Sequence, residues 1–180
     1  MRASETSVTD PSTRLKLELF HPPVEVERKF LVANDDWKHS VVGSVAIRDG
    51  LVALYKDRKV RVRIAERTAT ITVKGPRTGI RRDEFEYEIP LADAERMLGA
   101  ICDKDVLEKR RYFVEAPPAI WHVDVYTGLL DGVVLAEIEL LQENETLVLP
   151  SWVGREVTGD LRYRKFNLLA LHARRQPQPA

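Results

Sequence analysis

Acidic and basic side chains recur at every second position in several stretches of this chain. In VEVERKFLV (residues 24–32), Glu25, Glu27 and Lys29 alternate with mostly apolar residues. A β-strand has a side-chain period of two, so these three charges would share one face of a strand. Carboxylates are ligands that Mg²⁺ and Mn²⁺ prefer, whereas ammonium groups bind phosphate. A single strand of this kind could therefore serve a metal site and a phosphate site together.

The same alternation recurs in later segments of the chain. Some of these segments place only bases on one face and others only acids, whereas a surface selected for solubility usually mixes the signs. Sorting by sign suits a site that binds a polyanion through bases and a hard cation through carboxylates. The in-phase positions are Arg61 and Arg63 in VRVRI, Lys74 in TITVKG, Arg82, Glu84, Glu86 and Glu88 in RRDEFEYEI, Lys109 and Arg111 in EKRRYFV, Asp124 with His122 in WHVDVY, and Glu137 and Glu139 in LAEIEL.

Two arrangements explain this alternation. In the first, apolar residues face a core and the charges face water, as in most antiparallel sheets. In the second, the charges line the inside of a barrel, and the apolar faces pack outward against helices and loops. Both arrangements produce the same period, so the pattern alone leaves both open.

The composition restricts the class of protein. The 28 basic and 28 acidic residues cancel, so no overall field attracts nucleic acid or a membrane surface. The single cysteine, Cys102, excludes an internal disulfide and suits a reducing compartment. No apolar run approaches the length of a membrane span, and the first residues lack the apolar stretch of a signal peptide. These features predict a cytoplasmic protein.

Several common site motifs are missing from the sequence. GPRTGIRR lacks the Gly-Lys-Ser/Thr ending of a Walker phosphate loop. No His-Glu-x-x-His and no paired Cys-x-x-Cys occurs, and the four histidines are scattered. The histidines are therefore expected at the surface or in the core and not as metal ligands.

The charged segments must be positioned by strands, which turn signals separate. We expect strands near 24–32, 44–54, 59–66, 69–75, 80–90, 106–115, 119–126 and 133–141. Helices are expected near 34–42, over LADAERMLGAI after Pro90, and over roughly 160–175. Residues 23–175 would form one domain, with a mobile arm at 1–22 and a mobile tail at 176–180. Many strands and few helices predict a mainly β (α+β) fold with one antiparallel sheet, and closing it into a barrel would remove its exposed edges.

The order of the charged segments resembles that of a known family. EVERK is followed by VRVRI, TVKG, R-x-EFEYEI, K-x-RY, DVY and GVVLAEIEL, and then by PSWVGREVTGDLRY. Over residues 24–172 the chain resembles the CYTH domain, the triphosphate tunnel metalloenzyme superfamily, and most resembles its short bacterial inorganic tripolyphosphatases. The resemblance implies an eight-stranded antiparallel closed barrel that forms a charged tunnel with a few flanking helices. It therefore favours the second arrangement.

The resemblance also implies a role for each matching residue, with Mg²⁺ or Mn²⁺ as the cofactor. The bases that would bind phosphate oxygens are Lys29, Arg61, Arg63, Lys74, Arg82, Lys109 and Arg111. The carboxylates that would serve the metal are Glu25, Glu27, Asp124, Glu137 and Glu139. Catalysis would depend on Lys29, Arg63 and Glu139, and salt bridges from Glu84 and Glu86 would orient the bases.

The chain departs from the family pattern in two places. Relatives often read D-x-RY-x-N near the C-terminus, and this chain has Lys165 in place of the asparagine. The second strand reads IRDGLVAL where relatives often have a Gln-Gly-Tyr pattern, so Asp49 and Leu51 have no role assigned by the resemblance.

The function implied is metal-dependent hydrolysis of inorganic tripolyphosphate to pyrophosphate and phosphate inside the tunnel. The first alternative is a class IV-type adenylyl cyclase or an organic (thiamine or nucleoside) triphosphatase. It would need an aromatic platform for a base or thiazole, and none of the inward positions named above offers one. The second alternative is a non-catalytic polyphosphate-binding module. The expected partner is a small polyphosphate and not nucleic acid or a membrane, since few aromatics interleave with the bases. The sequence indicates no particular oligomeric state.

Overall fold

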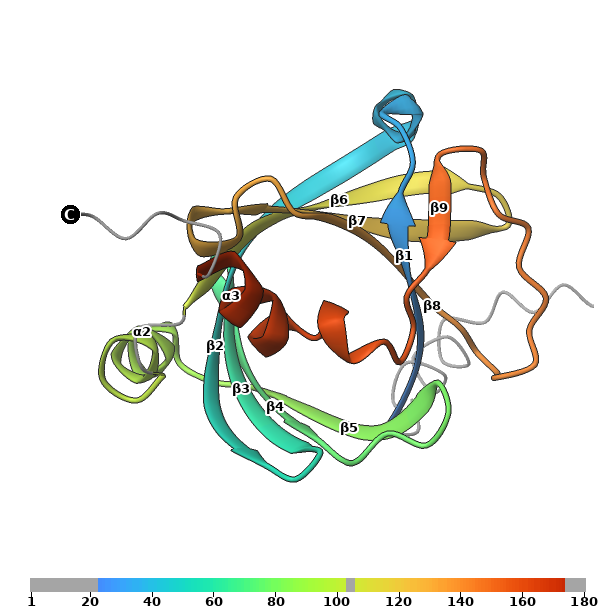
Figure 1. Ribbon diagram of the computed structural model, residues 1–180. Coiled ribbons are helices and arrows are strands. Elements are labelled where there is room, and N and C mark those ends of the chain that lie inside the picture. Colours follow the sequence, from blue (N-terminus) through green and yellow to red (C-terminus); the bar gives the residue numbers. More distant parts are fainter. Residues whose placement is uncertain (1–22, 103–105, 174–180) are drawn as a thin grey trace, which may run out of the picture.

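The computed structural model describes residues 23–102 and 106–173. Its strands are β1 (Val24–Val32), β2 (Val41–Tyr55), β3 (Arg58–Ala65), β4 (Thr68–Lys74), β5 (Arg81–Glu88), β6 (Leu107–Ala116), β7 (Ala119–Thr127), β8 (Val134–Glu139) and β9 (Val153–Glu156). Neighbours in the sheet follow the order β5-β4-β3-β2-β6-β7-β8-β1-β9, and a further pairing of β1 with β5 closes β1–β8 into a ring (Figure 1). The predicted eight-stranded antiparallel closed barrel is confirmed.

The helical segments are few, as the sequence indicated. They are the 3₁₀ turns η1 (Asp36–Ser40), η2 (Gly128–Leu130) and η3 (Leu161–Tyr163), and the α-helices α2 (Leu91–Ala100) and α3 (Lys165–Ala173). Among the described residues, no helix is both long and apolar enough to cross a membrane. The predicted arm at 1–22 and tail at 176–180 lie outside the residues that the structure describes.

Three elements differ from the sequence prediction. The helix expected over roughly 160–175 is divided into η3 and α3, and the Asp160 side chain caps η3 by accepting a hydrogen bond from the Arg162 backbone. The strand β9 and the turn η2 were not predicted. β9 is too short to show a period, and it pairs with the end of β1 where a Cβ on Gly154 would lie 3.1 Å from the Leu31 carbonyl oxygen.

The apolar faces of β1, β6, β7 and β8 point out of the barrel and form the main core. Phe30 packs edge-on against Trp121 (ring centroids 5.4 Å apart), which packs against Trp152 (5.5 Å). Val26, Ile138 and their neighbours complete this cluster beneath the segment that leads to β9. The second arrangement is therefore the observed one: apolar residues pack outside the barrel wall and charges line its interior.

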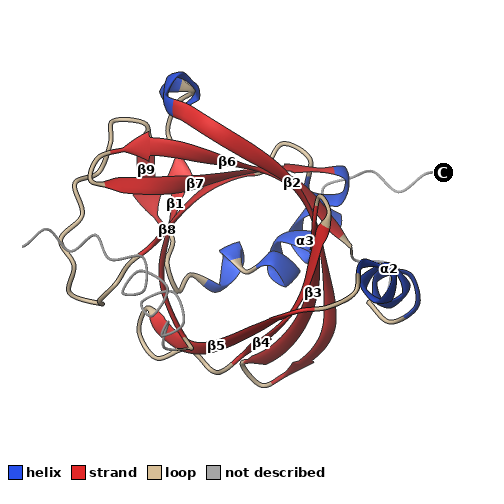
Figure 2. Cartoon of the chain, turned by 180° about the vertical axis from the view of Figure 1, so that it is seen from behind, coloured by secondary structure: helices blue, strands red, loops and turns tan. Residues whose placement is uncertain are grey.

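A second outer cluster is formed where α2 packs on β2 and β3 (Figure 2). Ala94 and Leu98 of α2 meet Val62 of β3, and buried Cys102 joins them. The backbone of β2 comes very close here, because a Cβ on Gly50 would lie only 2.5 Å from Leu98 Cδ2. Cys102 is a structural residue in this position.

The helix α3 lies within the ring of strands and covers one end of it (Figures 1 and 2). Leu168 and Leu169 of α3 pack against Tyr126, Leu130 and Leu135 at this end. The opposite end of the barrel carries the β3–β4 and β6–β7 turns. α3 thus occupies one end of the interior with its apolar side against β7, η2 and β8.

Candidate active site

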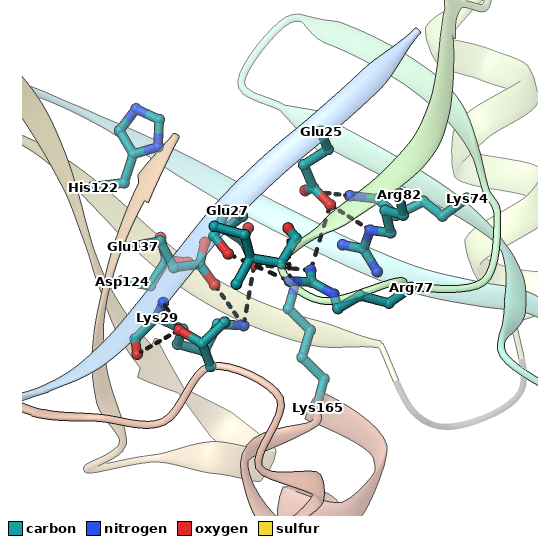
Figure 3. Close-up of polar contacts among 12 residues, drawn as sticks. Glu25, Glu27, Lys29, Lys74, Arg77, Arg82, His122, Asp124, Glu137 and Lys165 are labelled. Carbon is teal, nitrogen blue, oxygen red and sulfur yellow. Dashed lines mark hydrogen bonds and ion pairs between the residues drawn. The ribbon is translucent and has the colours of Figure 1, made fainter. Parts of the chain in front are cut away.

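Most of the charged residues singled out in the sequence meet inside the barrel in two groups of ion pairs, one around Glu25, Glu27 and Glu137 and the other around Asp49 (Figure 3). On β1, Glu25 accepts hydrogen bonds from Lys74 Nζ (2.9 Å) and from Arg82. Burial alone would raise the pKa of Glu25, but the charges of Lys74 and Arg82 hold it well below its usual range. Lys74 Nζ also donates to Glu84 (2.6 Å), which is the salt bridge predicted for this acid.

Lys29 lies two residues farther along the same face of β1. Its Nζ is 2.8 Å from Glu137 Oε1 and 3.9 Å from Glu27 Oε1. Burial opposes the charge of Lys29, but these carboxylates raise its pKa above the ordinary value. Arg28 points to the other side of the wall, where it forms an ion pair with Glu156 (2.6 Å).

Asp124 is fully buried between two bases of β6. Arg111 donates to both of its carboxylate oxygens (2.7 and 2.8 Å) and also to Glu137 (2.6 Å), and Lys109 donates to Asp124 as well. His122 lies beside them, with Nδ1 3.3 Å from Arg111 Nη1. Burial and the Arg111 charge lower the pKa of His122 to about 4, so its ring is neutral at physiological pH.

Asp49, left without a role by the sequence, lies on the inner face of β2. Its carboxylate is 3.1 Å from Arg63 Nε, 3.4 Å from Arg61 Nε and 2.8 Å from Lys165 Nζ. Lys165 is the first residue of α3 and points into the barrel (Figure 3). Glu86 lies 4.0 Å from Arg61, so it is close to a base, as predicted.

Two bases in the interior were missed by the sequence analysis. Arg77, in the loop between β4 and β5, approaches Glu27 (3.5 Å) and Glu25 (3.6 Å), and a loop has no period that could have revealed it. Lys59 lies directly opposite Lys74 in the β3–β4 ladder, and its phase with Arg61 could have revealed it. Lys59 forms no ion pair within 4 Å with any described residue.

Lys59 is therefore an unusual lysine. Burial, followed by repulsion from Arg82 and Lys74, lowers its pKa to about 7. A buried amine among like charges is stabilised by an anion. The environment of Lys59 thus fits an anionic ligand.

The carboxylates at the β1–β8 pairing fit a hard divalent cation. Glu27 and Glu139 are direct partners in the ladder, so two acids face each other. Burial, then the charges of Glu27 and Glu25, raise the pKa of Glu139, and no described residue forms an ion pair with it. Facing carboxylates repel each other, and a metal ion bound between them stabilises both. Within the described ranges, no three potential ligands are already gathered around one point, so binding requires side-chain rotation.

A cavity of about 210 Å³ lies at the end of the barrel opposite α3. Arg63, Arg111 and Glu86 line it together with apolar residues of β2 and β6. Phe113 is among the latter and is an aromatic side chain that the sequence analysis did not place inside. Its ring packs edge-on against His122 (centroids 5.4 Å apart, 80° between planes).

Comparisons with known proteins agree with this architecture. The CYTH domain family matches residues 24–170. A protein from Acetivibrio thermocellus named inorganic triphosphatase is 46% identical over 145 residues, which are 81% of this chain and 92% of that protein. Another protein of the same name, from Nitrosomonas europaea, is 33% identical over 146 residues, covering 78% and 93% of the two chains.

Solved structures show the same fold. The crystal structure of an inorganic triphosphatase superposes with a TM-score of 0.57 at 30% identity and covers 81% of this chain and 97% of that one. A protein from Pyrococcus horikoshii shares the fold alone, with a TM-score of 0.53 at 21% identity over 67% of this chain and 80% of that one. On its ordered motifs, its closed charged barrel and these matches, this chain belongs to the CYTH domain family.

Proposed function

We propose that this protein is a metal-dependent inorganic triphosphatase that cleaves tripolyphosphate to pyrophosphate and phosphate inside its barrel. The observation that carries the proposal is the interior itself, where bases from five strands surround a pair of facing glutamates. Relatives named inorganic triphosphatase align over most of the chain. A small inorganic polyanion is the substrate that matches an interior of this charge and size.

The bases would bind the phosphate oxygens. In the structure most of them pair with internal carboxylates, and an entering polyanion would replace some of these partners. Charge-assisted hydrogen bonds from fixed bases neutralise the phosphoryl groups, which is the main protein contribution to phosphoryl transfer. We assign this role to Lys29, Arg61, Arg63, Lys74, Arg82, Lys109 and Arg111, and also to Lys59 and Arg77, which lie beside them.

The carboxylates would hold Mg²⁺ or Mn²⁺. Glu27 and Glu139 are the best placed ligands, and Glu25 and Glu137 lie on the same two strands. When bound, the ion supplies positive charge against the phosphate oxygens. Asp124, predicted as a metal or water ligand, has both oxygens engaged by Arg111 and Lys109. We assign to Asp124 the role of orienting these two bases.

Hydrolysis also needs an oriented water and a stabilised leaving group. Glu139 has a raised pKa and, unlike Glu84, whose pKa is also raised, has no base paired with it among the described residues, which suits it to accept a proton from that water. Lys29 and Arg63 would stabilise the charge that develops on the departing phosphate. The single buried cysteine suits a reducing compartment, and we place the protein in the cytoplasm.

One observation keeps an organic triphosphate as the second candidate substrate. Phe113, Val45 and Ile47 give the cavity an apolar wall beside Arg63 and Arg111. A single ring already packed against His122 is a weak platform for a nucleobase. Inorganic tripolyphosphate therefore remains the better substrate.

The test is a phosphate-release assay with tripolyphosphate, ATP, thiamine triphosphate and pyrophosphate, each with Mg²⁺, with Mn²⁺ and with chelator. We expect a kcat/KM for tripolyphosphate well above that for ATP, poor cleavage of pyrophosphate, and no activity with chelator. If the protein forms cyclic AMP from ATP and does not cleave tripolyphosphate, it is an adenylyl cyclase. An unreactive protein whose melting temperature rises with tripolyphosphate would be a binding module.

A further inference from the structure

Asp49 is an acid placed among bases that the substrate needs. Only 4% of its surface is exposed, and its carboxylate contacts Arg61, Arg63 and Lys165. Arg63 donates to it from both Nε (3.1 Å) and Nη2 (3.4 Å), so this guanidinium is turned toward Asp49. An anion in this position competes with phosphate for the same two arginines.

Of the three bases that contact Asp49, Lys165 is the nearest, with its Nζ 2.8 Å from Asp49 Oδ2. It comes from the start of α3, a part of the chain 116 residues away from β2. Burial lowers the pKa of Lys165 and the charge of Asp49 opposes this effect, while Lys165 in turn helps to lower the pKa of Asp49. Each group is therefore the counterion that makes burial of the other tolerable.

We propose that Lys165 is a positioning residue that holds and neutralises Asp49, and so leaves Arg61 and Arg63 available to the phosphate chain. Asp49 and Lys165 act as one neutral unit in the wall of the site. This inference rests on the proposed function, because it concerns how the same site receives tripolyphosphate.

The charges dictate what each single substitution does. In Lys165→Met, Asp49 keeps its charge and has only the two arginines as partners, so it repels phosphate and occupies the arginines that should bind it. In Asp49→Asn, the bases lose an internal anion, so tripolyphosphate binds more tightly and its products leave more slowly. In the double variant the neutral unit is replaced by neutral side chains, and the competition disappears.

The experiment is a double-mutant cycle with Lys165→Met, Asp49→Asn and the double variant. We expect Lys165→Met to raise KM for tripolyphosphate about tenfold, Asp49→Asn to lower KM, and the double variant to return KM to within about threefold of wild type. Arg164→Met is the matched control, because Arg164 also ties the start of α3 to the β2–β3 turn, through Asp57 (2.8 Å), but its side chain is 47% exposed against 25% for Lys165. It should leave KM unchanged.

Two results would overturn the inference. Equal impairment of Lys165→Met and of the double variant would mean that Lys165 acts on its own, either on the substrate or by anchoring α3. A Lys165→Met variant with wild-type KM would mean that the pair has no effect on binding.

A second measurement separates this inference from the proposed function. Tripolyphosphate binding is measured by calorimetry without metal for wild type and the three variants of the cycle. Suppose that neither wild type nor any variant hydrolyses tripolyphosphate, but the double variant regains the binding affinity that Lys165→Met loses. The proposed function then fails and the inference stands. If wild type is active and the two substitutions have additive effects on affinity, the inference fails alone.

Discussion

Neighbouring residues in β1 have opposite environments, and this contrast defines the site at the scale of single side chains. Lys29 points into the barrel toward Glu137, whereas Arg28 points out toward Glu156. The sequence predicted this facing from the period of two, and it is confirmed. It did not predict which inward charges would pair, because pairs across the barrel depend on how the ring closes.

Lys29→Ala and Arg28→Ala test this facing directly. Loss of one charge-assisted contact to phosphate is worth roughly 1.5–3 kcal/mol, so Lys29→Ala should lower kcat/KM for tripolyphosphate by about tenfold to a hundredfold or more. Arg28→Ala removes only an outer ion pair and should change kcat/KM by less than about threefold. The measurement is steady-state kinetics of the two variants. An equal loss of kcat/KM in both would contradict the assigned facing.

Glu137 and Glu139 offer a second matched pair on β8. Glu139 faces Glu27 and is repelled by it, whereas Glu137 is held by Lys29 and Arg111. Without metal, Glu139→Gln should therefore keep or raise the melting temperature, and Glu137→Gln should lower it.

The same two variants also test the metal assignment. Both should lower the rate at limiting Mg²⁺, because each carboxylate lies on the strand assigned to the metal. The apparent Mg²⁺ affinity of Glu139→Gln should fall about tenfold or more. If both variants keep the wild-type rate at limiting Mg²⁺, these two glutamates are not metal ligands.

At the scale of elements, the sequence predicted the long strands, whose residues alternate with a period of two, and missed the short elements that have no such period. The long strands alternate along their length, so β1, β3 and β8 were placed to within a few residues. The short β9 carries no such signal and depends on contact with β1. The C-terminal helix was predicted, but its place inside the ring was not, because its leucines match any apolar surface.

Gly50 shows how closely two elements can approach. A side chain there would overlap Leu98 and Cys102, so Gly50→Ala must push α2 away from β2. Overpacking of this kind costs about 1–3 kcal/mol, which corresponds to a melting temperature lower by roughly 3–10 °C. Thermal unfolding should show this loss. Gly99→Ala, within α2 and with no neighbour within 4 Å, is the control and should be neutral or slightly stabilising.

At the scale of the molecule, charged side chains from different strands affect one another's pKa values across the barrel interior. Lys59 illustrates this, since burial and four bases from four strands (Arg82, Lys74, Lys29 and Arg61) lower its pKa to about 7. In the unfolded chain the pKa of this group is near 10.5. Between these values the unfolded chain holds a proton that the folded protein lacks, so the contribution of Lys59 to stability falls as the pH drops from about 10.5 to about 7.

Ligand binding should reverse this shift. Tripolyphosphate brings negative charge to Lys59 and raises its pKa, so binding above pH 7 should take up a proton, and affinity should fall as the pH rises. Calorimetry at pH 8 in buffers of different ionisation enthalpy measures this uptake. Lys59→Met should reduce the uptake, whereas the same uptake in wild type and variant would show that other groups are responsible.

Because α3 lies within one end of the ring, we expect the barrel to act as a dead end and not as a passage. Whatever enters must come back through the same mouth, so a product lying near the mouth has to depart before one lying deeper can follow. A long polyphosphate can offer only its terminus to such a site and cannot slide through it. Each cut would then require withdrawal and a fresh entry, and a polymer would be shortened stepwise from its tip.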